Sequence, residues 1–414
     1  MATTKKWDTD YEWKAVALLA LGFGMVGLDR WIIASLLPNI GPDLGITEAD
    51  GQRIVGYLGL AWGVFAIVTG RLGDKFGHRK VVIPAIFLFS IASFLSGLAT
   101  SVMGLIAIRV LMGITEGAYT PTSFAAVAAA AEPSRRGFLQ GVQQCGFALF
   151  GLALAPLIAG FLLTVVPSWR EVLWVVAIPG MIIGVLLVMV LREPGKTMGG
   201  AVLHEADKPV GGWSAVFNKN IILSMLALAG AMACVFVLGG VLPTYLQGYL
   251  GLAQGPALTV ASGLGFGGFV GQFGVPGLSD KFGRRTMAVI SFIGAALSVY
   301  YFQTLTPSAS VATLWIVLAL TSFFALGNVA LITGPIATES APAGLVAASI
   351  GIVVGAGEIF GGGIAPIIAG SVIDASGLHA VMFVALGGAI FGVLTSIFLT
   401  ETAPTKVGIP AGRR

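Results

Sequence analysis

Five ionisable side chains stand within long apolar stretches of this chain. They are Asp29, Arg30, Arg109, Glu116 and Glu358. A charge in the middle of a membrane-spanning helix costs roughly 3 kcal/mol or more, so such residues normally face a partner or a water-filled cavity. Arginine stays protonated and offers a planar fork to carboxylates, whereas carboxyl groups exchange protons. These residue types therefore suit the joint binding of an anion and a proton.

The spacing of these residues predicts which of them share a helix face. Arg109 and Glu116 are seven residues apart, which is two helical turns or about 10 Å, so both lie on one stripe of a helix. Asp29 and Arg30 are adjacent and diverge by about 100° around the axis. We expect one of these two to face a cavity and the other to contact a neighbouring helix.

Charge balance indicates how a proton and an anion would be linked. Two arginines without a bound anion are best neutralised by ionised Asp29 and Glu116. A substrate carboxylate can replace one of them only if a protein carboxyl takes up a proton. Burial disfavours an ionised carboxyl and a nearby arginine favours it, so protonation near the working pH is expected. Proton and anion binding would then favour each other, as symport requires. The alternative is that Arg109 and Glu116 form a structural tie.

Glu358 and several uncharged polar residues complete the candidate site. Glu358 stands in the glycine-rich stretch "GAGEIFGGGIAP" and is either a third proton site, a contact for a cationic part of the substrate, or a neutral hydrogen-bonded acid. The uncharged candidates for substrate binding are Tyr57, Tyr119, Gln144 and Asn328. Each of them equally suits an interhelical hydrogen bond, which is the commoner role. Trp62 is expected to be a packing residue.

The elements that hold these residues must be membrane-spanning helices. Hydrophobic residues make up 56% of the chain and charged residues 10%, against roughly a quarter charged in soluble domains. Apolar runs long enough to span a bilayer, about 20 residues, recur throughout. Twelve spans are predicted, at 13–39, 52–71, 81–100, 103–130, 138–165, 171–191, 218–247, 255–276, 287–305, 311–333, 343–370 and 379–400. The fold class is therefore all-α and polytopic.

The charges between the spans predict the domains and the orientation. One long polar stretch separates two groups of six spans, which gives a first bundle 1–192, a cytoplasmic linker 193–217 and a second bundle 218–414. Lysine and arginine gather in alternate loops, and the opposite loops hold only Arg53 and Arg170. This asymmetry predicts that both termini are cytoplasmic. The net charge of +4 is thus a property of loops, and no nucleic-acid partner is expected.

An internal repeat supports two related halves. The chain reads "GRLGDKFGHRK" from Gly70 and "PGLSDKFGRRT" from Pro276. The shared "DKFG" places Asp74 against Asp280 and, three residues later, glycine against glycine. Two homologous halves that face each other across a midplane site are typical of secondary transporters.

The first copy of this repeat resembles the loop signature between helices 2 and 3 of the major facilitator superfamily, and the second copy resembles its degenerate echo. The resemblance implies two pseudo-symmetric six-helix bundles. It also implies that Asp74, Arg79, Asp280 and Arg284 act in gating between inward-closed and outward-closed states. The alternative is that these basic residues serve only membrane topology.

Three further stretches resemble the anion:cation symporter branch of that superfamily and its Spinster-like relatives. They are "GLDRWIIASLLPNI", "IRVLMGITEGAYTP" and "SWREVLWVVAIPG". This resemblance implies that Asp29 and Glu116 are proton sites and that Arg30 and Arg109 face the anion. The expected function is proton-coupled uptake of a small organic anion, such as a sugar acid or an aromatic or aliphatic carboxylate, by alternating access.

Several further expectations follow. Protons are the expected coupling ion, without another cofactor, and His78, His204 and His379 are too scattered to form a metal site. We expect a monomer in a bacterial plasma membrane, and no nucleophile and base are arranged as in an enzyme. Two alternatives stay open. One is a proton-coupled efflux antiporter of drugs or amphipaths, for which "GLALAPLIAG" is a degraded signature. The other is a Spinster-like carrier of lysolipids or other lipids.

Overall fold

A computed structural model describes residues 7–45, 48–193 and 213–407 of this protein. Within these ranges the chain forms helices joined by short turns, which confirms the all-α fold class. The predicted linker 193–217 lies mostly outside the described residues. Of its last part, Trp213–Val216 forms the short 3₁₀ helix η3.

The first six spans correspond to six long helical segments. Four are single helices: α1 (Thr9–Leu44), α2 (Glu48–Phe76), α3 (His78–Ser96) and α4 (Val102–Ala130). The fifth is composite and runs through η1 (Pro133–Arg135), α5 (Arg136–Phe147), η2 (Ala148–Leu154) and α6 (Ala155–Val165). The sixth is α7 (Trp169–Val190).

The last six spans correspond to a second set of six. They are α8 (Lys219–Thr244) with η4 (Tyr245–Tyr249), α9 (Gln254–Phe282), α10 (Arg284–Thr304), α11 (Val311–Leu331) with η5 (Ile332–Ile336) and α12 (Ala337–Ser340), α13 (Val346–Ala356) with η6 (Gly357–Ile364) and α14 (Ala365–Ser376), and η7 (Leu378–Ala380) with α15 (Val381–Ser396). Each predicted span therefore falls on a helical segment of the described chain.

Length and composition identify ten of these segments as candidate membrane spans. The other two, α2 and α9, have 29 residues each, or about 43 Å at 1.5 Å per residue, against about 30 Å of bilayer hydrocarbon. Both are rich in glycine and carry charges near their ends, which lowers their mean hydropathy. Their glycines pack against other helices, so a less apolar sequence still fits a span.

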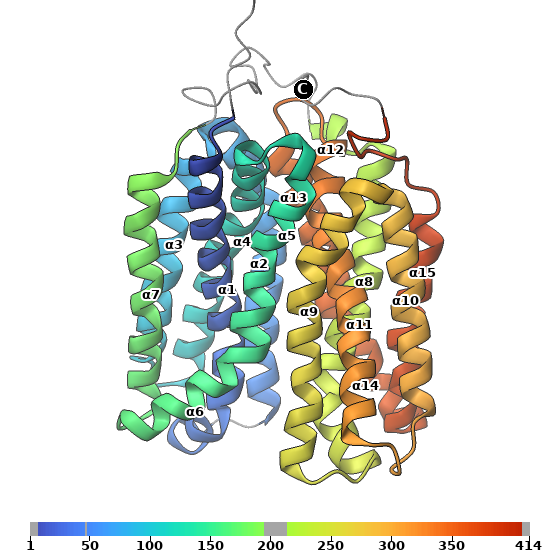
Figure 1. Ribbon diagram of the computed structural model, residues 1–414. Coiled ribbons are helices and arrows are strands. Elements are labelled where there is room, and N and C mark those ends of the chain that lie inside the picture. The colour runs from blue at the N-terminus through green and yellow to red at the C-terminus, as the bar shows by residue number, and fades with distance from the viewer. Residues whose placement is uncertain (1–6, 46–47, 194–212, 408–414) are drawn as a thin grey trace, which may run out of the picture.

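The two sets of helices lie side by side. Figure 1 shows α1 to α7 on one side of the molecule and α8 to α15 on the other. The described chain begins and ends at the same end of the bundle, which we call the terminal face. The turns between α2 and α3 and between α9 and α10 also lie at this face. It therefore carries both copies of the sequence repeat.

The repeat is visible in the backbone of these two turns. Gly77 has φ +96° between α2 and α3, and Gly283 has φ +101° between α9 and α10. Both values lie in the region that residues with a Cβ rarely adopt, so glycine allows the chain to reverse between the helices. The matching glycines of the two sequence copies thus perform the same structural task.

Glycines also bring the two halves into close contact. A Cβ on Gly70 of α2 would lie 2.4 Å from the carbonyl oxygen of Ala347, and one on Gly351 of α13 would lie 2.2 Å from that of Ala66. On the other side of the interface, a Cβ on Gly141 of α5 would lie 2.3 Å from the Gln272 oxygen of α9. Small residues permit such backbone approaches between membrane helices. The pairs α2/α13 and α5/α9 therefore join the halves directly.

Candidate functional site

The five charged residues singled out in the sequence all lie buried. Asp29 and Arg30 come from α1, Arg109 and Glu116 from α4, and Glu358 from η6 in the other half. Glu116 interacts electrostatically with each of the other four. The structure therefore gathers all five into one group, which we call the charge cluster.

Arg30 and Glu358 form an ion pair between the two halves. Nη1 and Nη2 of Arg30 each donate to one carboxylate oxygen of Glu358, both at 3.0 Å. The side chains are 4% and 3% exposed, and two parallel hydrogen bonds of this kind form the strongest arginine–carboxylate geometry. The Arg30 fork thus already holds a carboxylate, and it does so across the interface that alternating access would have to open.

Asp29 points to the opposite side of α1, into its own half. Its Oδ1 accepts a hydrogen bond from the Ser93 hydroxyl of α3 at 2.7 Å. Arg109 donates from Nη1 to the backbone oxygen of Asp29 at 2.8 Å and approaches the Met112 sulfur at 3.3 Å. Asp29 and Arg109 therefore tie α1, α3 and α4 together within the first half, while Arg30 reaches the second half.

Glu116 has the least satisfied carboxyl of the cluster. It is 0% exposed, and neither carboxyl oxygen has a hydrogen-bond partner among the described residues. Its backbone oxygen accepts from Thr120 Oγ1 at 2.8 Å, and that hydroxyl in turn accepts from the indole N–H of Trp62 at 3.1 Å. Burying a carboxylate charge without donors is costly, so this position is suited to a bound proton.

Wide π-helical turns occur at three places along the interface. Glu358 lies within η6, and Thr333 of η5 donates to Oε1 of Gln144 at 2.8 Å. In η2, Ala153 packs so closely on Gly265 of α9 that a Cβ on Gly265 would lie 2.9 Å away.

A proline stands within or just after each of these π-helical turns, at 156, 335 and 366. Proline removes a backbone donor and disturbs the regular helix, and π turns are frequent at functional sites. Our sequence analysis missed these turns, although the prolines signalled them.

The predicted gating carboxylates cap helices of the opposite half. Asp74 of α2 accepts from the backbone N–H groups of Ala347 and Ala348, at 2.9 and 2.8 Å, where α13 begins. Asp280 of α9 accepts from Phe138 at 3.0 Å and more weakly from its neighbour at 3.3 Å, where α5 begins. A carboxylate there satisfies free donors and meets the positive end of the helix dipole. The repeat thus forms two equivalent ties across the terminal face.

The two predicted gating arginines differ from each other. Arg284 is 1% exposed and donates to Asp280 at 2.6 Å and to Glu339 at 2.8 Å. Arg79 instead donates to the backbone oxygen of Val188 at 2.5 Å, at the end of α7. In the repeat, the position of Arg284 corresponds to His78, so only the second copy has a buried arginine there.

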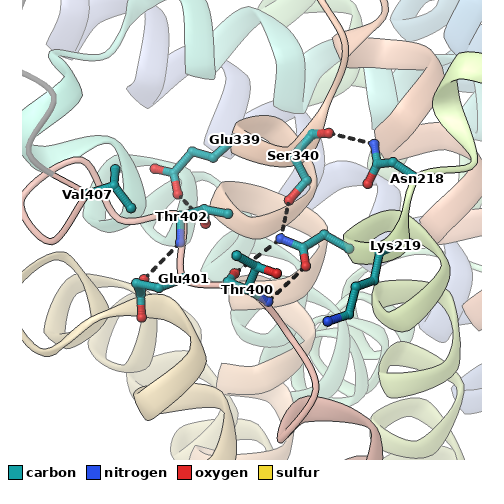
Figure 2. Close-up of a pocket in the computed structure, with 9 residues that line it drawn as sticks. Asn218, Lys219, Glu339, Ser340, Thr400, Glu401, Thr402 and Val407 are labelled. Carbon is teal, nitrogen blue, oxygen red and sulfur yellow. Dashed lines mark hydrogen bonds between the residues drawn. The ribbon is translucent and has the colours of Figure 1, made fainter.

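A polar cavity of about 340 Å³ lies beside the Arg284 network at the terminal face (Figure 2). Glu339 and Thr402 line it and hydrogen bond to each other at 2.9 Å. Asn220 donates to the Ser340 hydroxyl and to the Thr400 backbone oxygen. These lining groups bind one another, so the cavity is explained as part of the helix-end network.

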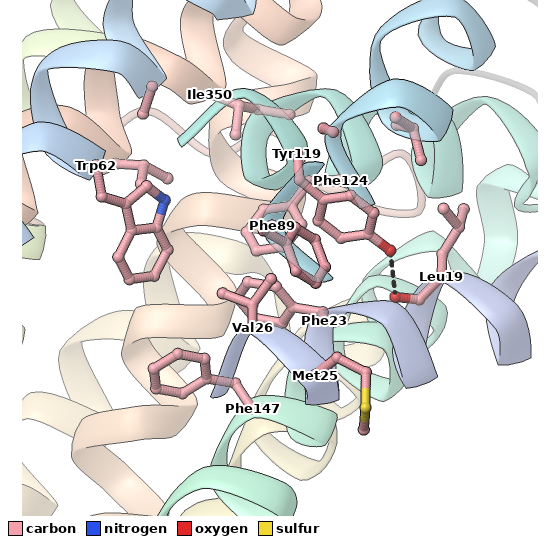
Figure 3. Packing of buried hydrophobic residues seen from close by; sticks show 14 of the residues in the cluster. Leu19, Phe23, Met25, Val26, Trp62, Phe89, Tyr119, Phe124, Phe147 and Ile350 are labelled. Atoms are coloured by element: carbon pink, nitrogen blue, oxygen red, sulfur yellow. Dashed lines mark hydrogen bonds between the residues drawn. The ribbon is translucent and has the colours of Figure 1, made fainter. Parts of the chain in front are cut away.

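The uncharged candidates are not brought to one place. Tyr119 donates to the Leu19 oxygen at 3.2 Å and meets Phe89 edge-on inside the first half (Figure 3). Asn328 donates to the Ala288 oxygen at 3.4 Å, which links α11 to α10. Gln144 donates across the interface to Ala330 at 3.2 Å, and Tyr57 is 45% exposed. For Tyr119 and Asn328 the contacts match an interhelical hydrogen bond.

Comparisons with known proteins agree with this architecture. The family model of the Major Facilitator Superfamily matches residues 19–353 and 259–414. The solved structure of the proton:xylose symporter XylE superposes with a TM-score of 0.77 at 18% identity, over 96% of this chain and 97% of that one. At that identity the similarity shows the fold alone.

Two relatives match over nearly their whole length. A probable 4-methylmuconolactone transporter of Cupriavidus pinatubonensis is 29% identical, over 90% of this chain and 87% of the relative. The probable sulfoacetate transporter SauU of Cupriavidus necator is 26% identical, over 93% of each. From the family match, the repeat and the twelve helical segments of the described chain, we conclude that this protein belongs to the major facilitator superfamily of membrane transporters.

Proposed function

We propose that this protein carries a small organic anion across the membrane together with protons, by alternating access, and that the charge cluster is its site. The ion pair between Arg30 and Glu358 carries this proposal, because it presents a carboxylate to an arginine fork at the boundary of the halves. The compounds named for the two relatives carry a carboxylate or sulfonate group. They support the same class of substrate for this chain.

The coupling follows from the charges of the cluster. When Glu116 is protonated, ionised Asp29 and Glu358 neutralise Arg30 and Arg109, so the cluster carries no net charge. An incoming anion can occupy the Arg30 fork only if Glu358 leaves it. Glu358 would then be a buried carboxylate without its partner, which is costly, unless it takes up a proton. We propose that this proton reaches Glu358 by way of Glu116, which is then protonated again, so that one proton per bound monoanion keeps the cluster neutral.

Conformational change follows from the same ion pair. The pair between Arg30 and Glu358 connects the halves near the middle of the molecule, while Asp74 and Asp280 connect them at the terminal face. An anion that displaces Glu358 replaces a tie between halves by a contact to one of them. A ligand shifts a conformational equilibrium only through such differences in contact. Binding and opening are thereby linked.

The direction of transport depends on the orientation in the membrane. Lysines and arginines gather at the terminal face, including Lys14, Lys75, Lys80, Arg135, Arg192 and Lys281. The positive-inside rule assigns this face to the cytoplasm. Because proton and anion move together, an inward proton gradient drives uptake of the anion.

Transport by the purified protein in liposomes tests this proposal. With an acidic exterior and a neutral interior, a radiolabelled organic acid such as 4-methylmuconolactone or 4-hydroxybenzoate should accumulate, and a proton ionophore should abolish the accumulation. Two results would contradict the proposal. If only neutral or cationic amphipaths raised the melting temperature of the purified protein, it would not be an anion carrier. If proton entry drove the solute out of the liposomes, the protein would instead be an efflux antiporter.

A further inference from the structure

Aromatic rings surround the Arg30 guanidinium. Its central carbon lies 4.6 Å from the ring centroid of Trp62, from α2, and 5.1 Å from that of Phe236, from α8. The ring of Trp31 lies 6.3 Å from Phe236, and that of Phe147 lies 6.1 Å from Trp62. Figure 3 shows Trp62 and Phe147 together in the first half. The anion site is therefore bordered by rings from both halves.

Two buried donors beside these rings have no hydrogen-bond partner among the described residues. They are Nε of Arg30 and the indole Nε1 of Trp31. An unpaired buried donor costs roughly 1–3 kcal/mol, so both atoms are suited to an oxygen of a bound molecule. Trp31 also packs against η2, where a Cβ on Gly151 would lie 2.7 Å from its ring. Because its ring also lies 6.3 Å from that of Phe236 in the second half, Trp31 stands at the interface.

The geometry of the fork favours a flat substrate. Two parallel hydrogen bonds place a carboxylate in the plane of the guanidinium. A ring conjugated with that carboxylate stays in this plane, and Trp62 and Phe236 are the rings that lie beside the guanidinium. A glycine lies beside each partner of the ion pair and adds no side-chain bulk there. A Cβ on Gly59 would lie 3.3 Å from Nη2 of Arg30, and a Cβ on Gly362 would lie 3.0 Å from Oε2 of Glu358.

A sugar acid suits these surroundings less well. Its hydroxyl groups need hydrogen-bond partners once they are buried, and each unpaired hydroxyl is costly. Trp62, Phe147 and Phe236 offer no acceptor to them. Edge or face contacts between aromatic rings, in contrast, add stability beyond the area that they bury.

The charges indicate a single negative charge on the substrate. Arg109 lies in the first half, where its Nη1 donates to the Asp29 backbone oxygen and the Asp29 carboxylate balances its charge, so Arg30 is the arginine of the charge cluster that pairs with the second half. In the described parts of α8 to α15, lysine and arginine occur only near helix ends. A second anionic group would therefore find no cationic partner in the second half.

From these observations we infer that the substrate is an aromatic monocarboxylate of the benzoate class, whose carboxylate replaces Glu358 on Arg30 and whose ring packs between Trp62 and Phe236. This inference rests on the proposed function and narrows it, since it excludes sugar acids and dianions as preferred substrates.

Thermal stabilisation of the full-length protein in detergent tests the inference. Benzoate and 4-hydroxybenzoate are compared with cyclohexanecarboxylate, which has a similar size and charge but a saturated ring, and with the dianion sulfoacetate. The pH is held where all four are ionised. We expect half-maximal stabilisation by the benzoates at roughly tenfold lower concentration than by cyclohexanecarboxylate, and the weakest effect from sulfoacetate.

Substitutions of Trp62 and Phe236 test whether these two rings cause the preference for benzoate over cyclohexanecarboxylate. Trp62→Leu and Phe236→Leu should each reduce the preference for benzoate over cyclohexanecarboxylate to about twofold, by weakening benzoate binding. Trp174→Leu is the matched control, because Trp174 stacks on Phe94 of α3 at a distance of 5.7 Å, away from Arg30. It should keep the full preference.

The outcomes separate the inference from the proposed function. Equal stabilisation of the wild-type protein by benzoate and cyclohexanecarboxylate, with proton-driven uptake of both, would overturn the aromatic preference and leave anion symport intact. Tighter binding of sulfoacetate than of benzoate would overturn the inference that the substrate carries a single negative charge. Absence of proton-driven accumulation for any of these acids would overturn the proposed function itself. The wild-type comparison is decisive even if a variant fails to fold.

Discussion

Glu116 and Glu358 are the same residue type in one cluster, yet their surroundings differ. Glu358 accepts two hydrogen bonds from Arg30, whereas the Glu116 carboxyl has no partner among the described residues. An ionised carboxyl is stabilised in the first setting and not in the second. At the residue scale we therefore propose that Glu358 forms a switchable ion pair and that Glu116 stores the proton.

Glu116→Gln should abolish accumulation driven by a proton gradient but retain exchange of the anion across the membrane. Glutamine resembles the protonated acid and cannot release a proton, so the loaded carrier can still move. Uptake and counterflow in liposomes measure the two activities. Glu132→Gln is a control, because Glu132 is a partly exposed carboxylate that pairs with Arg135. Normal accumulation by Glu116→Gln would remove Glu116 from the coupling.

Glu358→Gln should change how anion affinity depends on pH. In the wild-type protein affinity should rise as the pH falls, because protonation removes Glu358 from Arg30. In the variant the fork is free at any pH, so affinity should be roughly tenfold or more higher at neutral pH and nearly constant with pH. Without an anion the variant should melt earlier, since removing one partner of a buried ion pair costs roughly 3–5 kcal/mol.

Titration of binding at several pH values measures this change, with Arg30→Gln as the partner variant. Arg30→Gln removes the fork and should lose anion binding altogether. A Glu358→Gln protein with the wild-type pH dependence would show that Glu358 does not compete with the substrate.

At the scale of helices, two kinds of contact hold the terminal face closed. Asp74 and Asp280 cap α13 and α5 of the opposite half, and glycines let α2 approach α13 and α5 approach α9. The caps are hydrogen bonds that can be broken and remade, and the glycine contacts have almost no side-chain bulk. Both kinds suit a surface that closes tightly and separates again.

Gly351→Ala should prevent this closure. Its new Cβ would lie 2.2 Å from the Ala66 oxygen, a distance at which a backbone must shift. Gly387→Ala is the matched control, because a Cβ there meets nothing within 4 Å, and alanine stabilises a helix by roughly 0.5–1 kcal/mol relative to glycine.

Spin labels on Lys80→Cys and Lys281→Cys, which are exposed at the terminal face of the two halves, measure the separation. We expect Gly351→Ala to shift the distance distribution to larger values, and Gly387→Ala to leave it unchanged. The natural cysteines, Cys145 and Cys234, are buried. An unchanged distribution in Gly351→Ala would show that this contact does not limit closure.

At the scale of the whole molecule, the described residues include one buried ion pair between two halves that otherwise meet through small residues, helix caps and hydrogen bonds of glutamines on α5. The pair is the point at which a change of charge can affect the relative position of the halves. Its residues are 328 positions apart in the chain, and each is fixed by a different bundle. The transport cycle is therefore a property of the assembled molecule.

The orientation of the molecule gives a prediction at this scale. Single cysteines placed at Lys14 and Lys406, which are exposed near the two ends of the described chain, should react with an impermeant maleimide only when the cytoplasmic side is accessible. The positive-inside rule gives the reason. Inverted membrane vesicles compared with intact cells provide the measurement. Labelling in intact cells would reverse the topology and with it the proposed direction of uptake.

The sequence alone determined the twelve helical segments of the described chain, the repeat and the five charged residues. Hydrophobic spans and positive loops are local properties of the chain, and a buried charge is recognisable by its apolar neighbours. The divergence of Asp29 and Arg30 also followed from helix geometry. Asp74 and Asp280 were identified from their motif, but the helix ends that they cap were not.

Only the tertiary structure decided the partners. Arg30 pairs with Glu358 rather than with Glu116, and Trp62 and Phe236 border the fork, because residues of two bundles meet at an interface that no spacing along the chain encodes. Trp62 had been expected to serve packing, and Phe236 and Trp31 were not singled out. Aromatic residues are common in membrane helices, so their type alone did not distinguish a site from a core. The physical reason is the same throughout: periodicity gives the face of each helix, whereas contacts depend on how the helices pack.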